Sequence, residues 1–156
     1  MRKDPLSIRF AKSEDRTPAL LIVEDEVLIR LSVADYLRDC GFKVFEAADA
    51  GEALDILATE TAVDLVFSDV ALPGTMDGFA LAQRIRAERP GLPVMLASGD
   101  SRKAAIARDL CENEPFFAKP YDIDDVVRRI RGLIRSRRPE AADGRVRRCE
   151  GAEARG

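Results

Sequence analysis

The segment FSDVALPGTMDG, residues 67–78, places a carboxylate directly after a strand of buried type. Residues 65–67 are apolar, and Asp69 follows a single serine with no turn signal in between. An uninterrupted apolar run is typical of a strand that is covered on both faces, as in a parallel sheet. The pattern therefore predicts an acid at the carboxyl end of a buried strand.

The same alternation of a short apolar strand and an amphipathic helix runs through most of the chain. Gly41 follows the first helix at a C-cap position, and Asp122 precedes the last helix at an N-cap position. The short connections predict an α/β fold, a (βα)5 doubly wound sandwich around a five-stranded parallel sheet. The expected strands are 20–23, 43–47, 65–69, 93–97 and 115–118, and the expected helices are 27–40, 50–59, 79–89, 102–112 and 123–134.

Length and charge bound the organisation of the chain. Its 156 residues are 46% hydrophobic, which is enough for one core and too few for two ordinary domains. We expect a flexible leader over 1–18, one domain over 19–135 and a disordered basic tail over 136–156, where one valine stands among charged and small residues. The central residues 19–134 carry 13 Lys/Arg against 21 Asp/Glu, which argues against a nucleic-acid-binding fold.

Composition excludes several kinds of site. The chain has no histidine, which excludes imidazole metal sites, Ser/His/Asp triads and a phosphohistidine carrier. Its three cysteines lack CxxC spacing, so no disulfide framework or zinc site is indicated, and Cys40 and Cys111 are interpreted as small core residues. No stretch reaches the ~20 apolar residues of a membrane span, and no secretory signal opens the chain. We therefore expect a cytoplasmic protein.

Polar groups follow four of the expected strands: Glu24 and Asp25, then Asp69, then Ser98, then Lys119. Each alone has an ordinary explanation as a helix cap, a turn or a solvated strand end. Ligands of parallel sheets bind at the carboxyl ends of strands. The presence of polar groups at four such ends on one edge of the sheet therefore favours a binding site. Neighbouring carboxylates repel one another unless a cation neutralises them, and Mg²⁺ fits a sparse oxygen cluster. Asp69 is then a candidate nucleophile toward a phosphoryl group, whose oxygens the ion, Lys119 and Ser98 would stabilise.

These motifs, in this order and spacing, resemble the receiver domain of two-component response regulators over roughly residues 19–134. They are LIVEDE, DLVFSDVALPG, MDG, PVMLASGD and FFAKPY. The resemblance implies a flavodoxin/CheY-like fold with Mg²⁺ as the cofactor. It also implies the site roles: Asp69 as the phospho-acceptor, Asp25 as a direct metal ligand, Glu24 as a ligand acting largely through water, Ala71 as a backbone carbonyl ligand, Ser98 as the switch hydroxyl, Lys119 as the phosphoryl contact and Phe116 as the rotating aromatic.

The chain departs from the common receiver pattern at three places. The segment between Pro73 and Asp77 is one residue longer than in the commonest form, a version similar to receivers of hybrid histidine kinases and stand-alone receivers. Ser98 replaces the commoner threonine and keeps the hydroxyl. Phe116 has no hydroxyl, and plain core packing beside Phe117 is the alternative to a switching role. Alternation along the strand implies that only one of the two phenylalanines faces a given side.

The resemblance implies a single-domain response regulator. A cognate histidine kinase or histidine phosphotransferase would phosphorylate it, and a surface formed by 102–112, 115–118 and the last helix would then bind a downstream protein or a second copy. We expect at most self-phosphorylation and self-dephosphorylation as enzymatic activity, no membrane contact, and no DNA-binding domain, because the 22 residues after Ile134 are few and polar. The alternatives are a phosphorylation-independent, receiver-like docking module and nucleic-acid binding by the arginine-rich tail, which its interspersed acids disfavour.

Overall fold

A computed structural model describes residues 16–60, 62–100, 102–103, 106 and 116–137. Within these residues the strands form one parallel sheet in the order β2-β1-β3-β4-β5. The strands are β1 (Ala19–Val23), β2 (Lys43–Ala47), β3 (Leu65–Asp69), β4 (Val94–Ser98) and β5 (Phe116–Ala118), and the helices are α2 (Val27–Asp39), α3 (Ala50–Thr59), α4 (Gly78–Glu88) and α6 (Ile123–Arg137).

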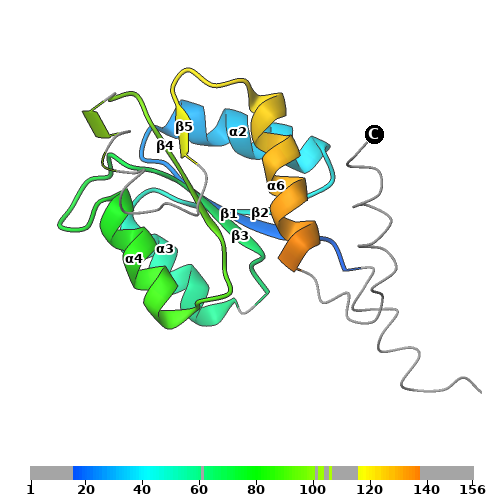
Figure 1. Ribbon diagram of the computed structural model, residues 1–156, viewed down its shortest axis with the longest axis horizontal. Helices are drawn as coiled ribbons and strands as arrows, with labels where there is room; N and C mark the ends of the chain where they lie inside the picture. The colour runs from blue at the N-terminus through cyan, green and yellow to red at the C-terminus, as the bar shows by residue number, and fades with distance from the viewer. Residues whose placement is uncertain (1–15, 61, 101, 104–105, 107–115, 138–156) are drawn as a thin grey trace, which may run out of the picture.

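The predicted doubly wound fold is confirmed. The strand order turns back between β1 and β3, which is the flavodoxin-like arrangement that creates a ligand site at this point of the sheet. Helices α3 and α4 cover one face of the sheet, and α2 and α6 cover the other (Figure 1). The carboxyl ends of β1 and β3 therefore lie side by side between two layers of helices.

Two apolar cores, one on each face of the sheet, hold these layers together. Along β1 and β3, Leu21 and Val66 pack with α3 and α4, whereas Leu20 and Phe67 pack with α2 and α6. β1 and β4 are buried along their whole length, and β3 is buried up to Asp69. This explains the unbroken apolar runs in the sequence, because both faces of these strands are covered.

The ends of the elements follow the predicted local signals. Gly41 adopts φ 102° after α2, in the left-handed region that glycine enters without a Cβ penalty. The Asp122 carboxylate accepts a hydrogen bond from the Asp124 N–H at 3.0 Å, as expected of an N-cap. β4 runs over Val94–Ser98 rather than starting at Pro93, which has no N–H to donate.

Some of the expectations from the sequence fall outside the described residues. These are most of the helix expected over 102–112, the beginning of the strand expected over 115–118, Cys111, and the leader and tail beyond 16–137. Cys40 lies within them and is partly buried against the α2/α6 core. The helix α6 continues to Arg137, past the boundary at 135 that the composition suggested.

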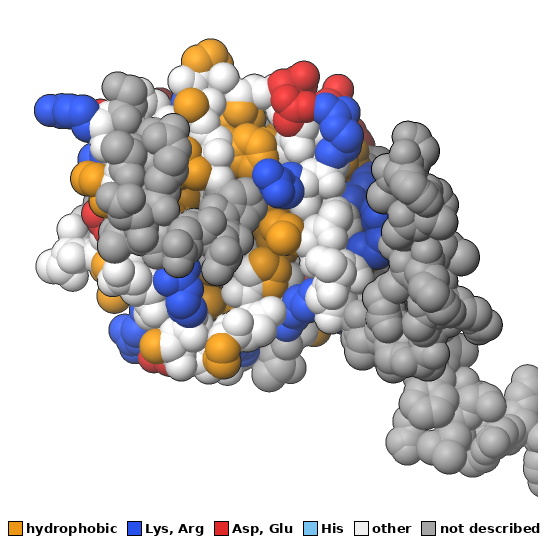
Figure 2. All heavy atoms as spheres, viewed as in Figure 1, with side chains coloured by type: hydrophobic (Ala, Val, Ile, Leu, Met, Phe, Trp, Pro, Cys, Tyr) orange, Lys and Arg blue, Asp and Glu red, His pale blue; other side chains and the backbone are white. Residues whose placement is uncertain are grey.

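The surface of the described part is mixed in character. Figure 2 shows hydrophobic side chains along the middle of one face, flanked by Lys and Arg side chains. Helix α6 adds charges of both signs to the surface, with acids in its first turn and arginines in its last. No helix among the described residues combines the length and the apolar character needed to cross a bilayer.

Candidate functional site

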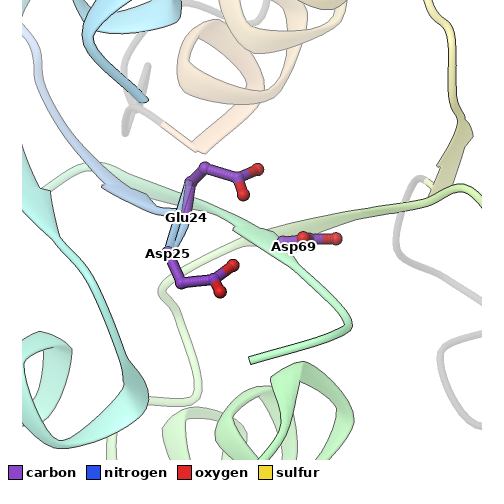
Figure 3. A group of neighbouring side chains, drawn as sticks. All are labelled: Glu24, Asp25 and Asp69. Atoms are coloured by element: carbon purple, nitrogen blue, oxygen red, sulfur yellow. The ribbon is translucent and has the colours of Figure 1, made fainter. Parts of the chain in front are cut away.

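The carboxyl ends of β1 and β3 bring three acids together. Val23 is paired with Ser68 across the two strands, so the residues that follow them emerge next to each other. Three carboxylate oxygens, one from each of Glu24, Asp25 and Asp69, lie within 4.8 Å of one another. Figure 3 shows the carboxylates of Glu24 and Asp25 turned toward the side on which Asp69 lies. The structure thus assembles the acidic cluster expected at this edge.

Lys119 reaches this cluster from the end of β5. Its Nζ lies 3.2 Å from Oε1 of Glu24 and 3.3 Å from Oδ2 of Asp69. The Lys119 N–H donates to the Ser98 carbonyl at 2.9 Å, which ties the lysine to the end of β4. The residues after β1, at the end of β3 and after β5 therefore meet, and the end of β4 is bonded to Lys119 through the Ser98 carbonyl.

Burial controls the electrostatics of the cluster. Desolvation raises the pKa of Glu24, and repulsion from Asp69 adds to this shift, while the Glu26 N–H and the Lys119 ammonium oppose it. Burial lowers the pKa of Lys119, but the Asp69 and Glu24 carboxylates outweigh it and leave this pKa above its ordinary value. One ammonium thus faces several carboxylates, and the surplus of negative charge favours binding of a cation.

The donor set fits a hard divalent cation. It consists of carboxylate oxygens alone, and its members differ in burial: Glu24 is buried, Asp69 is half-buried and Asp25 is exposed. Among the described residues, the Asp25 carboxylate has no hydrogen-bond partner, so it is available as a ligand. Mg²⁺ keeps several waters and takes few carboxylates, which matches a sparse cluster at an open sheet edge.

Ser98 and Ala71, two further residues expected at the site, have different surroundings. Ser98 is buried at the end of β4, and its Oγ accepts a hydrogen bond from the Asp100 N–H at 3.1 Å. The hydroxyl hydrogen is therefore available to another acceptor, although no hydrogen bond joins Ser98 to Asp69 within the described residues. Ala71 is exposed, and no described residue donates to its carbonyl. The roles of both residues remain predictions.

The two phenylalanines of β5 face opposite sides of the sheet. Phe116 packs against the α3/α4 core, and Phe117 packs against the α2/α6 core. The ring centroid of Phe117 lies 6.1 Å from that of Phe67 and 6.1 Å from that of Tyr121. The alternation expected from the sequence is confirmed, while the rotation of Phe116 remains a prediction.

Two residues that shape the site were not identified from the sequence. Arg30 on α2 donates from Nη1 to the Glu24 carbonyl at 2.8 Å. A Cβ on Gly78 would lie 2.3 Å from the Asp69 carbonyl oxygen, so α4 starts in close contact with the end of β3. The Asp-Gly pair at 77–78 carried a signal for this close approach. No comparable signal marked Arg30, because an arginine on a helix is usually solvated.

Comparison with known proteins gives a family match that covers most of the described chain. A family model for the response regulator receiver domain matches residues 20–131. The probable transcriptional regulatory protein TcrX of Mycobacterium tuberculosis is 32% identical over 125 residues, which make up 80% of this chain and 53% of that protein. The chain spans about half the length of the curated relatives it matches.

Solved structures agree with this match. The receiver domain of the hybrid histidine kinase CckA is 36% identical, with a TM-score of 0.60, over 74% of this chain and 98% of that chain. The response regulator TrrA of Thermotoga maritima, in complex with Mg²⁺–BeF, is 23% identical, with a TM-score of 0.67, over 75% of this chain and 99% of that chain. Because the matched residues run from β1 into α6, the chain belongs to the response regulator receiver domain family.

Proposed function

We propose that this chain is a phospho-accepting signalling switch in the cytoplasm. It takes a phosphoryl group from a histidine kinase or a histidine phosphotransferase onto Asp69, with Mg²⁺ bound at the acidic cluster. The modified sheet edge then changes a surface that binds a downstream protein or a second copy of the chain. The family match supports the general role, since receiver domains are the signalling module of two-component systems.

The observation that carries this proposal is that Asp69 lies next to the Lys119 ammonium and to two further carboxylates. Lys119 Nζ lies 3.3 Å from Asp69 Oδ2, and the oxygens of Glu24 and Asp25 are within 4.8 Å. A carboxylate in this position can be approached by an anionic phosphoryl group only if positive charge is present nearby. Lys119 supplies part of that charge from the chain itself.

Phosphoryl transfer to Asp69 exchanges one bond to phosphorus for another. An oxygen of the Asp69 carboxylate forms a bond to phosphorus, while the bond from phosphorus to the donor's imidazole nitrogen breaks and that nitrogen keeps the electron pair. None of the 156 residues is histidine, so the donor histidine lies outside these residues.

The residues around Asp69 each have a place in this step. Asp25, Asp69 and the Ala71 carbonyl would hold Mg²⁺ directly and Glu24 through water, and the ion would supply positive charge to the phosphoryl oxygens. The Lys119 ammonium would contact a second oxygen, and the Ser98 hydroxyl would donate to a third. Phosphorylation adds about −1.5 to −2 charge at the sheet edge, which draws Ser98 toward it and lets Phe116 turn inward.

Acetyl phosphate with Mg²⁺ tests this function directly. We expect the intact mass of the wild type to rise by one phosphoryl group, while Asp69→Asn stays unmodified because its amide is not a nucleophile. Asp55→Asn is the matched control, because it removes an exposed acid on α3 and keeps the cluster. Equal labelling of wild type and Asp69→Asn, or no labelling of the wild type by any phosphodonor, would contradict the proposal. In the second case a phosphorylation-independent docking module becomes the better description.

A further inference from the structure

The turn that carries the acids, residues 24–26, is held by hydrogen bonds to the polar groups of Glu24. The Glu24 N–H donates to the Ala47 carbonyl at 3.0 Å. Its carboxylate accepts from the Glu26 N–H and from Lys119 Nζ, each at 3.2 Å. Its carbonyl accepts from Arg30 Nη1 at 2.8 Å. Two of these bonds come from side chains of other residues: Lys119 bonds to the Glu24 carboxylate, and Arg30 bonds to the backbone carbonyl.

Arg30 is well placed to hold this carbonyl still. Its Nε lies 3.2 Å from Oε1 of Glu46 on β2, and its side chain is only 16% exposed. The guanidinium thus bridges the β1–α2 turn and the neighbouring strand with two hydrogen bonds from one rigid plane. A lysine could make either contact as a point charge, but it has no such planar fork.

The peptide bond whose carbonyl Arg30 holds joins Glu24 to Asp25. The Asp25 carboxylate has no hydrogen-bond partner among the described residues, so its position depends on the backbone that carries it. We propose that Arg30 is a positioning residue for the metal site: it fixes the Glu24–Asp25 peptide and so preorganises the Asp25 carboxylate for Mg²⁺. This inference rests on the proposed function, because it takes the acidic cluster to be a Mg²⁺ site.

Arg38 provides a matched comparison on the same helix. It also pairs with Glu46, with Nη2 3.1 Å from Oε2, and it also donates to a main-chain carbonyl, that of Val44 at 2.8 Å. Val44 lies near the start of β2, whereas the acidic cluster lies at the other end of the sheet. Arg30 and Arg38 therefore share a partner and differ in which part of the backbone they hold.

A positioning role and a purely electrostatic role predict effects of opposite sign. If Arg30 acted only as a nearby positive charge, its removal would reduce repulsion and strengthen Mg²⁺ binding. If it acts by fixing the turn, its removal weakens Mg²⁺ binding, because outer contacts that orient metal ligands typically contribute about 10- to 100-fold to affinity. The direction of the change therefore separates the two roles.

The test is a titration of the full chain with Mg²⁺, in which binding is measured from the NMR chemical shifts of the backbone amides of residues 24–26. We expect Arg30→Met to raise the dissociation constant about tenfold or more. Arg30→Lys should weaken binding as well, because one ammonium cannot replace both guanidinium contacts. Arg38→Met should bind Mg²⁺ as the wild type does.

Several outcomes would overturn the positioning role. These are unchanged or tighter Mg²⁺ binding by a folded Arg30→Met, and an equal loss in Arg38→Met, which would assign the effect to Glu46. If circular dichroism shows that Arg30→Met is unfolded, Arg30→Lys is used instead. Unchanged or tighter Mg²⁺ binding by folded Arg30→Lys then overturns the positioning role. Failure of the proposed function gives a different result, since the wild type itself would then show no Mg²⁺-dependent shifts at these amides.

Discussion

At the scale of single residues, Glu24 is a carboxylate whose charged form is disfavoured by burial. It is buried beside Asp69, and its pKa is raised by desolvation first and by that repulsion second. The Lys119 ammonium offsets part of this cost but leaves the net shift upward. A buried carboxylate with a raised pKa is a candidate for a functional group, which agrees with the proposed role of Glu24 in binding a cation.

Glu24→Gln should stabilise the metal-free protein at neutral pH. The folded chain holds the Glu24 proton more tightly than the unfolded chain does, so this group makes stability fall as pH rises above its ordinary pKa of 4.5. The amide removes that effect. We expect a higher unfolding temperature than the wild type at neutral pH in EDTA, with the difference vanishing below pH 4.5, and Mg²⁺ affinity about tenfold weaker.

Thermal melts across pH, followed by circular dichroism, measure this difference. Asp55→Asn serves as the control because it neutralises an exposed acid of α3. A Glu24→Gln protein that is less stable than the wild type at neutral pH would mean that the Lys119 pair outweighs the burial of the carboxylate.

At the scale of elements, the start of α4 is fitted to the end of β3. The Gly78 N–H donates to the Val70 carbonyl at 2.8 Å, and Asp77 caps the helix by accepting from the Ala80 N–H at 2.9 Å. A Cβ on Gly78 would lie 2.3 Å from the Asp69 carbonyl oxygen and 2.7 Å from the Val70 Cα. The helix therefore packs directly on the backbone of Asp69, the proposed phospho-acceptor, and only glycine allows this contact.

Gly78→Ala should destabilise the fold by about 1–3 kcal/mol, because the new methyl meets main-chain atoms that cannot move aside cheaply. Gly132→Ala is the matched control within α6, where a Cβ would meet nothing within 4 Å, and it should stabilise the fold by about 0.5–1 kcal/mol. Urea unfolding of both variants measures the effects. Similar stabilities for the two would show that α4 can shift away from β3 at little cost.

The helices α2 and α6 are joined at the surface by a hydrogen bond from the Tyr36 hydroxyl to the Asp124 carboxylate. This bond, with smaller contributions from burial and nearby acids, raises the pKa of Tyr36 to about 12. Asp124→Asn should return this pKa toward its ordinary value of 10.0. Because the folded chain keeps this proton longer, wild-type stability falls as pH rises from 10.0 to about 12.

Phenolate absorbance during an alkaline titration measures this pKa, and Tyr36→Phe identifies which transition belongs to Tyr36. The chain has two tyrosines, so the remaining transition in that variant belongs to Tyr121. An unchanged Tyr36 transition in Asp124→Asn would mean that the two helices are not joined by this bond in solution.

At the scale of the whole molecule, Asp64 ties the two ends of the described chain together. Its carboxylate accepts from Nη1 and Nη2 of Arg16, at 3.1 and 2.8 Å, and from the Ala19 N–H at 2.8 Å. Nη1 of Arg137 lies 3.7 Å from the same carboxylate and 3.4 Å from the Asp64 carbonyl. The start of β1 and the end of α6 lie on the same side of the molecule (Figure 1). These contacts of Asp64 lie at the amino end of β3, whereas Asp69 lies at its carboxyl end.

Asp64→Asn should lower the stability of the domain by about 1–3 kcal/mol, because several charge-assisted hydrogen bonds to a buried carboxylate are lost. Phosphorylation of Asp69 by acetyl phosphate should be unaffected below the melting temperature, since the two residues lie at opposite ends of β3. Asp35→Asn, which removes an exposed acid paired with Arg38 at 3.5 Å, is the control for urea unfolding. A loss of phosphorylation at unchanged stability would contradict this separation of roles.

Much of the fold could be predicted because its signals are local. The bounds of α3, β2 and β3 agree with the predictions from apolar periodicity and from turn residues, and Gly41 and Asp122 act as the expected caps. The acids of the site could also be predicted, since they follow their strands directly. Arg30 and Asp64 could not, because each acts through partners on other elements, and a single arginine or aspartate carries no mark of such a partner.

By itself, the sequence determined the alternation of strands and helices and the set of chemical groups at the strand ends, because periodicity and composition act within a few residues. Only the tertiary structure decided that β1 lies between β2 and β3, and that Lys119 reaches Glu24 from 95 positions away. It also decided that Arg30 holds the turn that carries Asp25. These contacts depend on how the layers pack, since the two cores fix the register of distant strands and bring their ends to one edge.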